Sequence, residues 1–194
     1  MSDKKQAILE EVLNLLHHHT EETFTMSNLA KHLSIAKSTL YEYFENKQTM
    51  IAQALRYLID THIQELLALE GEEHQSFDER LKLYFNRLVN LTQKKRSMSS
   101  VMYHPEVGAL SEALKLQVHA KVQDAYRLSE TRLHEIIAQG HREGRLNKAL
   151  SDGALHAVEA LFFGSVIALA DPFNQWDQST LADDVIEALI KLHA

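Results

Sequence analysis

Apolar residues recur at intervals of three or four along most of this 194-residue chain, and this spacing constrains its fold most strongly. An α-helix places such residues on one face, because it has about 3.6 residues per turn. No stretch alternates apolar and polar residues as a strand does, and the sequence contains only two prolines. It therefore predicts an all-α fold of about nine helices. The clearest run is Met50, Ile51, Ala54, Leu55, Leu58, Ile59, Ile63, Leu66 and Leu67.

The predicted helices divide the chain into two parts. A head of three helices is expected over residues 1–46, and a helical bundle for ligand binding and dimerisation over residues 47–194. Within the head, residues 25–44 give the order helix, tight turn, short helix. This is the order of a helix-turn-helix, whose second helix lies in the DNA major groove.

Several residues mark where helices should begin or end. Thr25 and Asn46 are favourable N-caps, and Ser76 with Glu79 has the spacing of a capping box. Pro105 is expected to end a short helix over residues 97–104, because proline cannot continue a helix.

The second helix of the motif has an apolar side and a polar side. Leu40 and Phe44 are four positions apart and are expected to face the core. Lysine and tyrosine side chains can bind phosphates, and serine or threonine can reach base edges. Lys47 lies in the first turn of the next helix, where backbone N–H groups also favour a phosphate. The residues left facing outward are Lys37, Ser38, Thr39, Tyr41 and Tyr43.

At these residues the sequence resembles the tetracycline-repressor (TetR) family of bacterial transcriptional regulators. The matching positions are Thr25, Leu29-Ala30, Thr39-Leu40-Tyr41-Glu42-Tyr43-Phe44 and Lys47, and further along Gly140, Gly144 and Leu146. The family's turn glycine is Ser34 here, and the usual cap of the recognition helix is Ala36. A serine with positive φ costs about 1 kcal/mol, unless Ser34 caps the helix itself. The resemblance implies that DNA is contacted by Thr25, Ser27, Lys37, Ser38, Thr39, Tyr41, Tyr43 and Lys47.

The C-terminal part of the bundle combines apolar residues with small ones that permit close helix approach. As in the family, a pair of such helices is expected to meet its two-fold copy in a four-helix interface. A homodimer would present two recognition helices about 34 Å apart to a palindromic operator. The expected interface residues are Leu155, Leu161, Phe162, Gly164, Ser165, Leu169, Leu181, Val185 and Leu189.

The resemblance also implies an effector pocket within the bundle. The candidates are His62, Tyr84, Met102, Tyr103, His104, His119, Tyr126 and Phe162, each of which can equally be an ordinary packing residue. Their mixture of aromatic, methionine and histidine side chains favours a small, largely apolar ligand with one or two polar anchors. Such a ligand would move the helix after the head, change the spacing of the heads and lower operator affinity.

Composition excludes several other classes. The net charge of −7 argues against non-specific nucleic-acid binding by the whole surface, so DNA contact must be local. There is no cysteine, no metalloprotease, hydrolase or dinucleotide motif and no phosphate loop, so no catalytic residue, cofactor or metal is expected. The most apolar run, residues 157–170, contains Glu159 and is too short to span a bilayer, and the first residues lack the apolar core of a signal peptide, so secretion is not expected.

The sequence therefore predicts a cytoplasmic, ligand-responsive repressor that is not an enzyme. Its expected partners are double-stranded operator DNA, a small-molecule effector and a second copy of itself. No association with a membrane is expected. Two other interpretations stay open. One is a helical-bundle carrier or enzyme, and the other is a regulator whose head binds protein rather than DNA.

Overall fold

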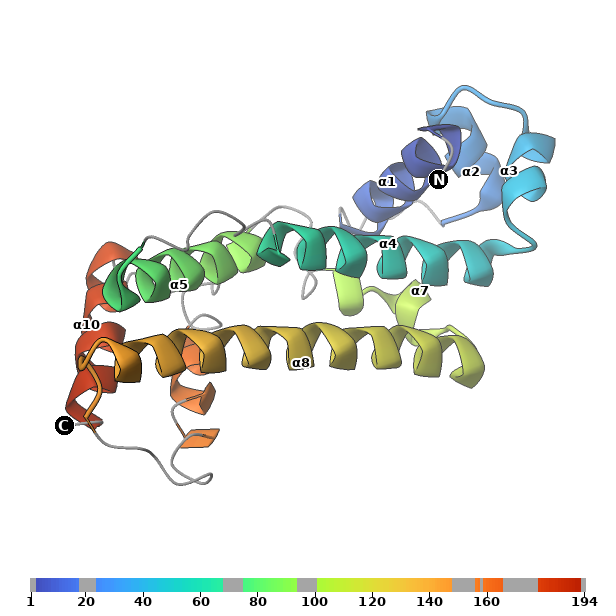
Figure 1. Ribbon diagram of the computed structural model, residues 1–194. Coiled ribbons are helices and arrows are strands. Elements are labelled where there is room, and N and C mark those ends of the chain that lie inside the picture. The colour runs from blue at the N-terminus through green and yellow to red at the C-terminus, as the bar shows by residue number, and fades with distance from the viewer. Residues whose placement is uncertain are drawn as a thin grey trace. The chain divides into compact units, whose positions relative to one another are not determined.

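The computed structural model describes residues 3–17, 24–67, 75–93, 101–147, 156–157, 159–165 and 178–192. The all-α prediction is confirmed, because these residues form helices joined by turns, with no strand among them. Residues 159–165 are helical as well. The labelled helices are α1 (Asp3–His17), α2 (Met26–His32), α3 (Lys37–Tyr43), α4 (Lys47–Leu67), α5 (Phe77–Gln93), α7 (Pro105–Gly108), α8 (Glu112–Arg142) and α10 (Gln178–Leu192) (Figure 1).

The contacts between residues divide the chain into two compact units. Unit 1 comprises residues 1–62 and 95–125, and unit 2 comprises residues 63–94 and 126–194. Both α4 and α8 contribute residues to each unit. The predicted head, residues 1–46, lies wholly within unit 1, and its boundary at residue 46 stays a prediction.

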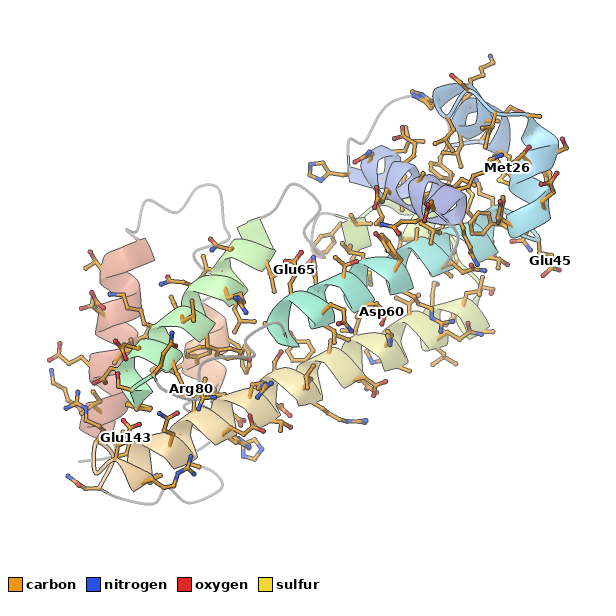
Figure 2. The ribbon with its side chains drawn as sticks, turned by 45° about the horizontal axis from the view of Figure 1, so that its top comes forward. Met26, Glu45, Asp60, Glu65, Arg80 and Glu143 are labelled. Carbon is orange, nitrogen blue, oxygen red and sulfur yellow. The ribbon has the colours of Figure 1, made fainter. Side chains whose placement is uncertain are left out.

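The apolar residues that recur at helical spacing in the sequence form the core of unit 1. Met26, at the start of α2, is 7% exposed and belongs to this core (Figure 2). Leu40 and Phe44 are buried, as predicted from their spacing on α3. The other core residues of the head and α4 include Ile8, Leu9, Val12, Leu13, Leu16, Leu29, Ala30, Met50, Ile51, Ala54, Leu55 and Leu58.

The predicted caps are present. The Thr25 hydroxyl accepts a hydrogen bond from the Asn28 N–H at 3.1 Å, and Asn46 Oδ1 accepts one from the Thr49 N–H at 2.9 Å. The Glu79 carboxylate accepts a bond from the Ser76 N–H at 2.9 Å, as in a capping box. These bonds satisfy N–H groups that a helix start leaves without a partner. The starts of α2, α4 and α5 therefore follow from local sequence.

In unit 2 the start of α5 contacts the end of α8, in the region where Figure 2 labels Arg80 and Glu143. Glu143 accepts a hydrogen bond from the Phe77 N–H at 2.9 Å, which lowers the pKa of its carboxyl. Gly140 is needed here, because a Cβ atom would lie 2.8 Å from both Leu146 Cδ1 and Phe77 Cδ2. No helix within the described ranges has the length and apolar character that a membrane span requires.

Candidate nucleic-acid interface

The turn between α2 and α3 is a Schellman motif with a serine in the place of glycine. The Ile35 N–H bonds the Ala30 carbonyl and the Ser34 N–H bonds the Lys31 carbonyl, each at 3.0 Å. Ser34 has a φ of 53°, as expected for the residue that replaces the turn glycine. The alternative that Ser34 caps α3 is wrong, because Ala36 is the N-cap and no side chain caps that helix. The turn therefore keeps its geometry without either favoured residue.

This turn presents the polar side of α3 to solvent. Lys37 and Ser38 are exposed, and Tyr41 is 50% exposed. The Lys37 ammonium lies 6.0 Å from the centre of the Tyr41 ring, within the range of a cation–π contact. Thr39 and Tyr43 are half-buried. The face thus combines a cation, hydroxyl groups and an aromatic ring, which can hydrogen-bond to phosphates and base edges.

The remaining predicted contact residues lie at the starts of α2 and α4. Ser27 is exposed, whereas Thr25 is half-buried and uses its hydroxyl oxygen as the cap of α2. Lys47 is engaged within unit 1. Its ammonium donates to the Phe24 carbonyl at 3.2 Å and to Glu106 Oε1 at 2.9 Å, and it lies 2.8 Å from Glu106 Oε2. The predicted phosphate ligand Lys47 therefore already has an anionic partner.

The predicted pocket residues are distributed over both units. Unit 1 contains His62, Met102, Tyr103, His104 and His119, and unit 2 contains Tyr84, Tyr126 and Phe162. Tyr103 is 85% exposed, and the His104 imidazole caps α7 by accepting a hydrogen bond from the Glu106 N–H. These two side chains have local roles at the surface or at a helix start.

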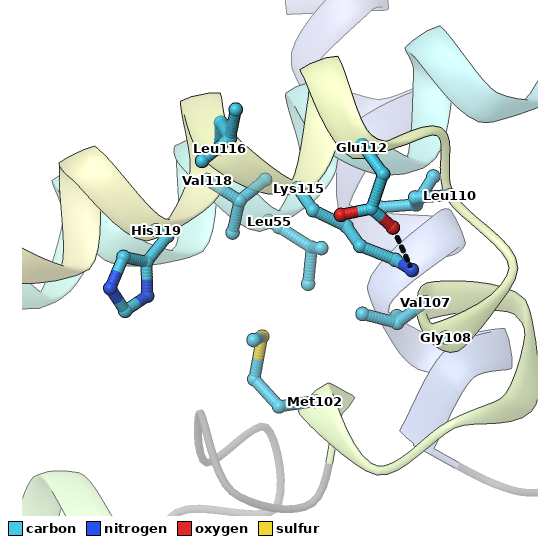
Figure 3. Close-up of a pocket in the computed structure, with 10 residues that line it drawn as sticks. All are labelled: Leu55, Met102, Val107, Gly108, Leu110, Glu112, Lys115, Leu116, Val118 and His119. Atoms are coloured by element: carbon cyan, nitrogen blue, oxygen red, sulfur yellow. Dashed lines mark hydrogen bonds and ion pairs between the residues drawn. The ribbon is translucent and has the colours of Figure 1, made fainter.

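Unit 1 contains a cavity of about 370 Å³ that includes two of the predicted residues, Met102 and His119 (Figure 3). Its apolar floor consists of buried side chains of α4, α7 and α8, such as Leu55 and Val118. Its polar groups come from α8, where Lys115 bonds Glu112 at 2.9 Å. The remaining lining residues are Val107, Gly108, Leu110 and Leu116.

In unit 2, Phe162 lies at the centre of an aromatic cluster. Its ring stacks on Tyr84 at 5.7 Å between centroids and meets the edge of Phe85 at 5.3 Å. Tyr84 is buried and donates a hydrogen bond to the Ser129 carbonyl at 2.8 Å, and its burial raises the pKa of the phenol. Phe162 has no exposed surface, so its predicted place in a dimer interface is corrected to the core of unit 2. Tyr126 is 54% exposed and contacts Phe163.

The other predicted interface residues have mixed outcomes. Val185 is buried in the core of unit 2, so it offers little surface to a partner. Leu161 is 44% exposed, and a Cβ atom at Gly164 would meet nothing within 4 Å. The Ser165 hydroxyl donates to the Leu161 carbonyl at 2.8 Å. Leu155 and Leu169, and the side chains of Leu181 and Leu189, lie outside the part of the chain that the structure describes.

Two residues at this site were missed by sequence reasoning. Glu106 and Gln48 join α4 to residues 104–111, although 59 and 61 positions separate the bonded partners. No local spacing rule links residues so far apart, and an isolated glutamate or glutamine carries no signal of its own. Within the described ranges, no three His, Asp or Glu side chains gather as a metal site would require.

The sequence model of bacterial regulatory proteins of the tetR family matches residues 5–54. The resemblance to the tetR family is confirmed. The match covers the tetR-type helix-turn-helix and the first turns of α4, so it includes every predicted DNA-contact residue. No curated protein matches the sequence.

Solved structures extend the likeness to the whole chain at the level of fold. The superantigen PfiT has a TM-score of 0.74 at 15% identity, covering 97% of this chain and 96% of its own. A TetR-family protein from Vibrio parahaemolyticus has a TM-score of 0.66 at 20% identity, covering 97% and 95%. FadR from Bacillus subtilis, solved with stearoyl-CoA, has a TM-score of 0.65 at 17% identity, covering 95% and 97%. Because one fold can carry unrelated functions, these likenesses establish the fold alone.

Proposed function

We propose that this protein is a DNA-binding transcriptional regulator that reads its operator with α3. The observation that carries the proposal is the exposed polar face of α3, held by a Schellman turn above a buried Leu40 and Phe44. Lys37, Ser38 and Tyr41 are free of core packing and can reach a groove. The match to the tetR family over the same residues supports this assignment.

The regulator acts as a homodimer. One head offers few positive charges, because residues 25–50 contain three lysines against two acids. A second head doubles the number of phosphate contacts and reads the other half of a palindrome. The exposed Leu161 and the open surface at Gly164 are the described residues that fit a helix–helix interface.

In this proposal the protein is a cytoplasmic repressor and not an enzyme. It leaves its operator when a small, largely apolar effector binds. The cavity of about 370 Å³ in unit 1 supports this part of the proposal, since its floor is apolar and its polar groups gather on α8. FadR from Bacillus subtilis has a similar fold, and its crystal structure contains stearoyl-CoA, a ligand with a long apolar chain.

The test uses DNA selected by the protein from a randomised duplex pool. The double variant Thr39→Ala, Tyr41→Ala removes a hydroxyl and an aromatic ring from the polar face of α3 and spares its buried side. We expect this variant to lose binding in gel-shift titrations while its oligomeric state and helix content stay unchanged. The matched control changes two exposed side chains of α8, Gln117→Ala with Thr131→Ala, and should keep full affinity.

Normal affinity of the α3 variant would exclude α3 as the reading helix. Failure of the unaltered protein to enrich any sequence would reject DNA binding as a whole. If the protein then turned over a small molecule, the interpretation as a helical-bundle carrier or enzyme would be favoured. If its head captured a protein, the interpretation as a regulator whose head binds protein rather than DNA would be favoured.

A further inference from the structure

The ammonium of Lys47 is held by three oxygen atoms of unit 1. It donates to the Phe24 carbonyl at 3.2 Å and to Glu106 Oε1 at 2.9 Å, and Glu106 Oε2 lies 2.8 Å away. A lysine ammonium has three N–H donors and one positive charge. The carbonyl takes one donor, and the carboxylate takes the remaining donors and balances the charge. Lys47 therefore has little left to offer another anion while the pair is closed.

The backbone on both sides of Glu106 is held by contacts other than Lys47. Glu106 lies in the first turn of α7, and its N–H bonds the His104 imidazole at 3.1 Å. The Gln48 amide holds the following residues, because it donates to the Ala109 carbonyl at 3.1 Å and accepts from the Ser111 N–H at 3.3 Å. The first turn of α4 thus binds residues 104–111 through two adjacent side chains, Lys47 and Gln48. Glu106 is presented to Lys47 by a segment that is already docked.

The pair remains close enough to solvent to be opened. The Lys47 side chain is 35% exposed and that of Glu106 is 21% exposed. An ion pair of this kind contributes little net stability, because water competes for both charges. A DNA phosphate offers the ammonium the same charge and a similar arrangement of oxygen atoms as the carboxylate does.

We propose that Glu106 competes with operator phosphate for Lys47 and thereby lowers operator affinity. This inference rests on the proposed function and adds a residue from outside the helix-turn-helix that sets binding strength. Lys47 must exchange one anion for another when the protein binds DNA, so its contribution is reduced by the free energy of opening the pair. Val107 and Leu110 of the same segment line the cavity in unit 1, so the segment that carries the competing carboxylate also forms part of the cavity wall.

The experiment compares the full chain with Glu106→Gln, which keeps the side-chain shape and removes the charge. We expect affinity for selected DNA to rise about fivefold for each head, the upper limit for an exposed ion pair, or about 25-fold for a dimer. In the unaltered chain the Glu106 carboxylate is left uncompensated when Lys47 moves to a phosphate, so its removal should also steepen the slope of log affinity against log salt, by at most about 1.8 for a dimer. A residue with a merely structural role would not change this slope.

Two further variants identify the cause. Asp60→Asn removes the same charge from unit 1. Asp60 Oδ1 pairs with the Lys121 ammonium at 2.6 Å and lies outside the head, so this change should leave affinity nearly unchanged. In a Lys47→Gln background, Glu106→Gln should have no effect on affinity, since the group for which it competes is gone. Thermal unfolding of every variant is measured alongside.

An unchanged or weaker affinity of Glu106→Gln at an unchanged melting temperature would overturn the inference and leave DNA binding by α3 intact. An equal gain in the Lys47→Gln background would overturn it as well, because general charge repulsion would then be the cause. If no variant, including the unaltered chain, bound selected DNA, the proposed function itself would fail and this inference with it.

Discussion

Replacing Ala36 by serine should stabilise the recognition helix without adding any contact to DNA. Ala36 is the N-cap of α3 and has extended backbone angles of −68° and 143°, but its side chain cannot accept a hydrogen bond. Thr25 occupies the equivalent position of α2, with angles of −124° and 153°, and its hydroxyl accepts from the Asn28 N–H. The two helices have the same length, so α2 shows what α3 lacks.

The magnitude follows from the N–H groups of the first turn of α3, to which no side chain of the N-cap offers an acceptor. Exchange of alanine for serine at an N-cap typically adds about 1 kcal/mol of stability. Ala36 is exposed, so the new hydroxyl displaces no packed side chain. If α3 opens locally, 1 kcal/mol corresponds to about fivefold slower hydrogen exchange of the amides of residues 37–43.

Hydrogen exchange measured by mass spectrometry on the full chain is the appropriate assay, because it reports on α3 separately from the rest of the protein. The control Ala36→Val adds bulk at the same exposed position but no acceptor, so it should not slow exchange. Equal protection in the serine and valine variants would refute the assignment of Ala36 as an uncapped N-cap.

Three further predictions concern stability. Ser34→Gly should raise the free energy of unfolding by up to about 1 kcal/mol, because Ser34 has a φ of 53°; lower stability in urea unfolding would contradict the left-handed turn. Gly140→Ala should cost about 1 to 3 kcal/mol, since its Cβ would lie 2.8 Å from buried atoms of Leu146 and Phe77. Gly164→Ala, with nothing within 4 Å, is its control and should not destabilise the monomer. The Phe77 N–H lowers the pKa of Glu143, so this carboxylate stabilises the fold above its unfolded pKa, and the contribution is lost as pH falls through the folded pKa. Glu143→Gln should therefore reduce the acid sensitivity of unfolding below the ordinary pKa of a glutamate, and an unchanged pH profile would contradict the bond.

The elements that the sequence predicted well depend on local physics. The caps at Thr25 and Asn46 and the buried pair Leu40 and Phe44 each involve residues within four positions of one another. Helical geometry brings such residues together whatever the rest of the chain does. The unfavourable backbone of Ser34 was predictable for the same reason.

The elements that were missed depend on contacts between distant segments. Residues 101–102 are helical and this helix ends before Pro105, as predicted, but Pro105 also begins α7 with His104 as its cap, a position that proline favours and the sequence analysis did not assign. Phe162 and Val185 were assigned to a dimer interface, yet both are buried in unit 2. Apolar residues on a helix look alike in sequence whether they face a core or a partner, and only tertiary packing separates the two.

The ion pair of Lys47 and Glu106 was missed for the same reason, because it joins distant segments of the chain. Its residues are 59 positions apart, and the sequence alone suggested that Lys47 was available to DNA. Among the candidate pocket residues, Tyr84 lies in the core of unit 2 and Met102 lines the cavity of unit 1, and local spacing predicts neither place. The types of residue in a site were therefore more predictable than their grouping.

Selection of DNA from a randomised duplex pool, followed by footprinting with the unaltered chain and the Thr39→Ala, Tyr41→Ala variant, tests the central claim most directly. We predict that the unaltered chain enriches a palindromic sequence and protects both of its halves, whereas the variant protects neither at the same concentration. Equal protection by the two proteins, or no enriched sequence for the unaltered chain, would contradict the claim that α3 reads DNA.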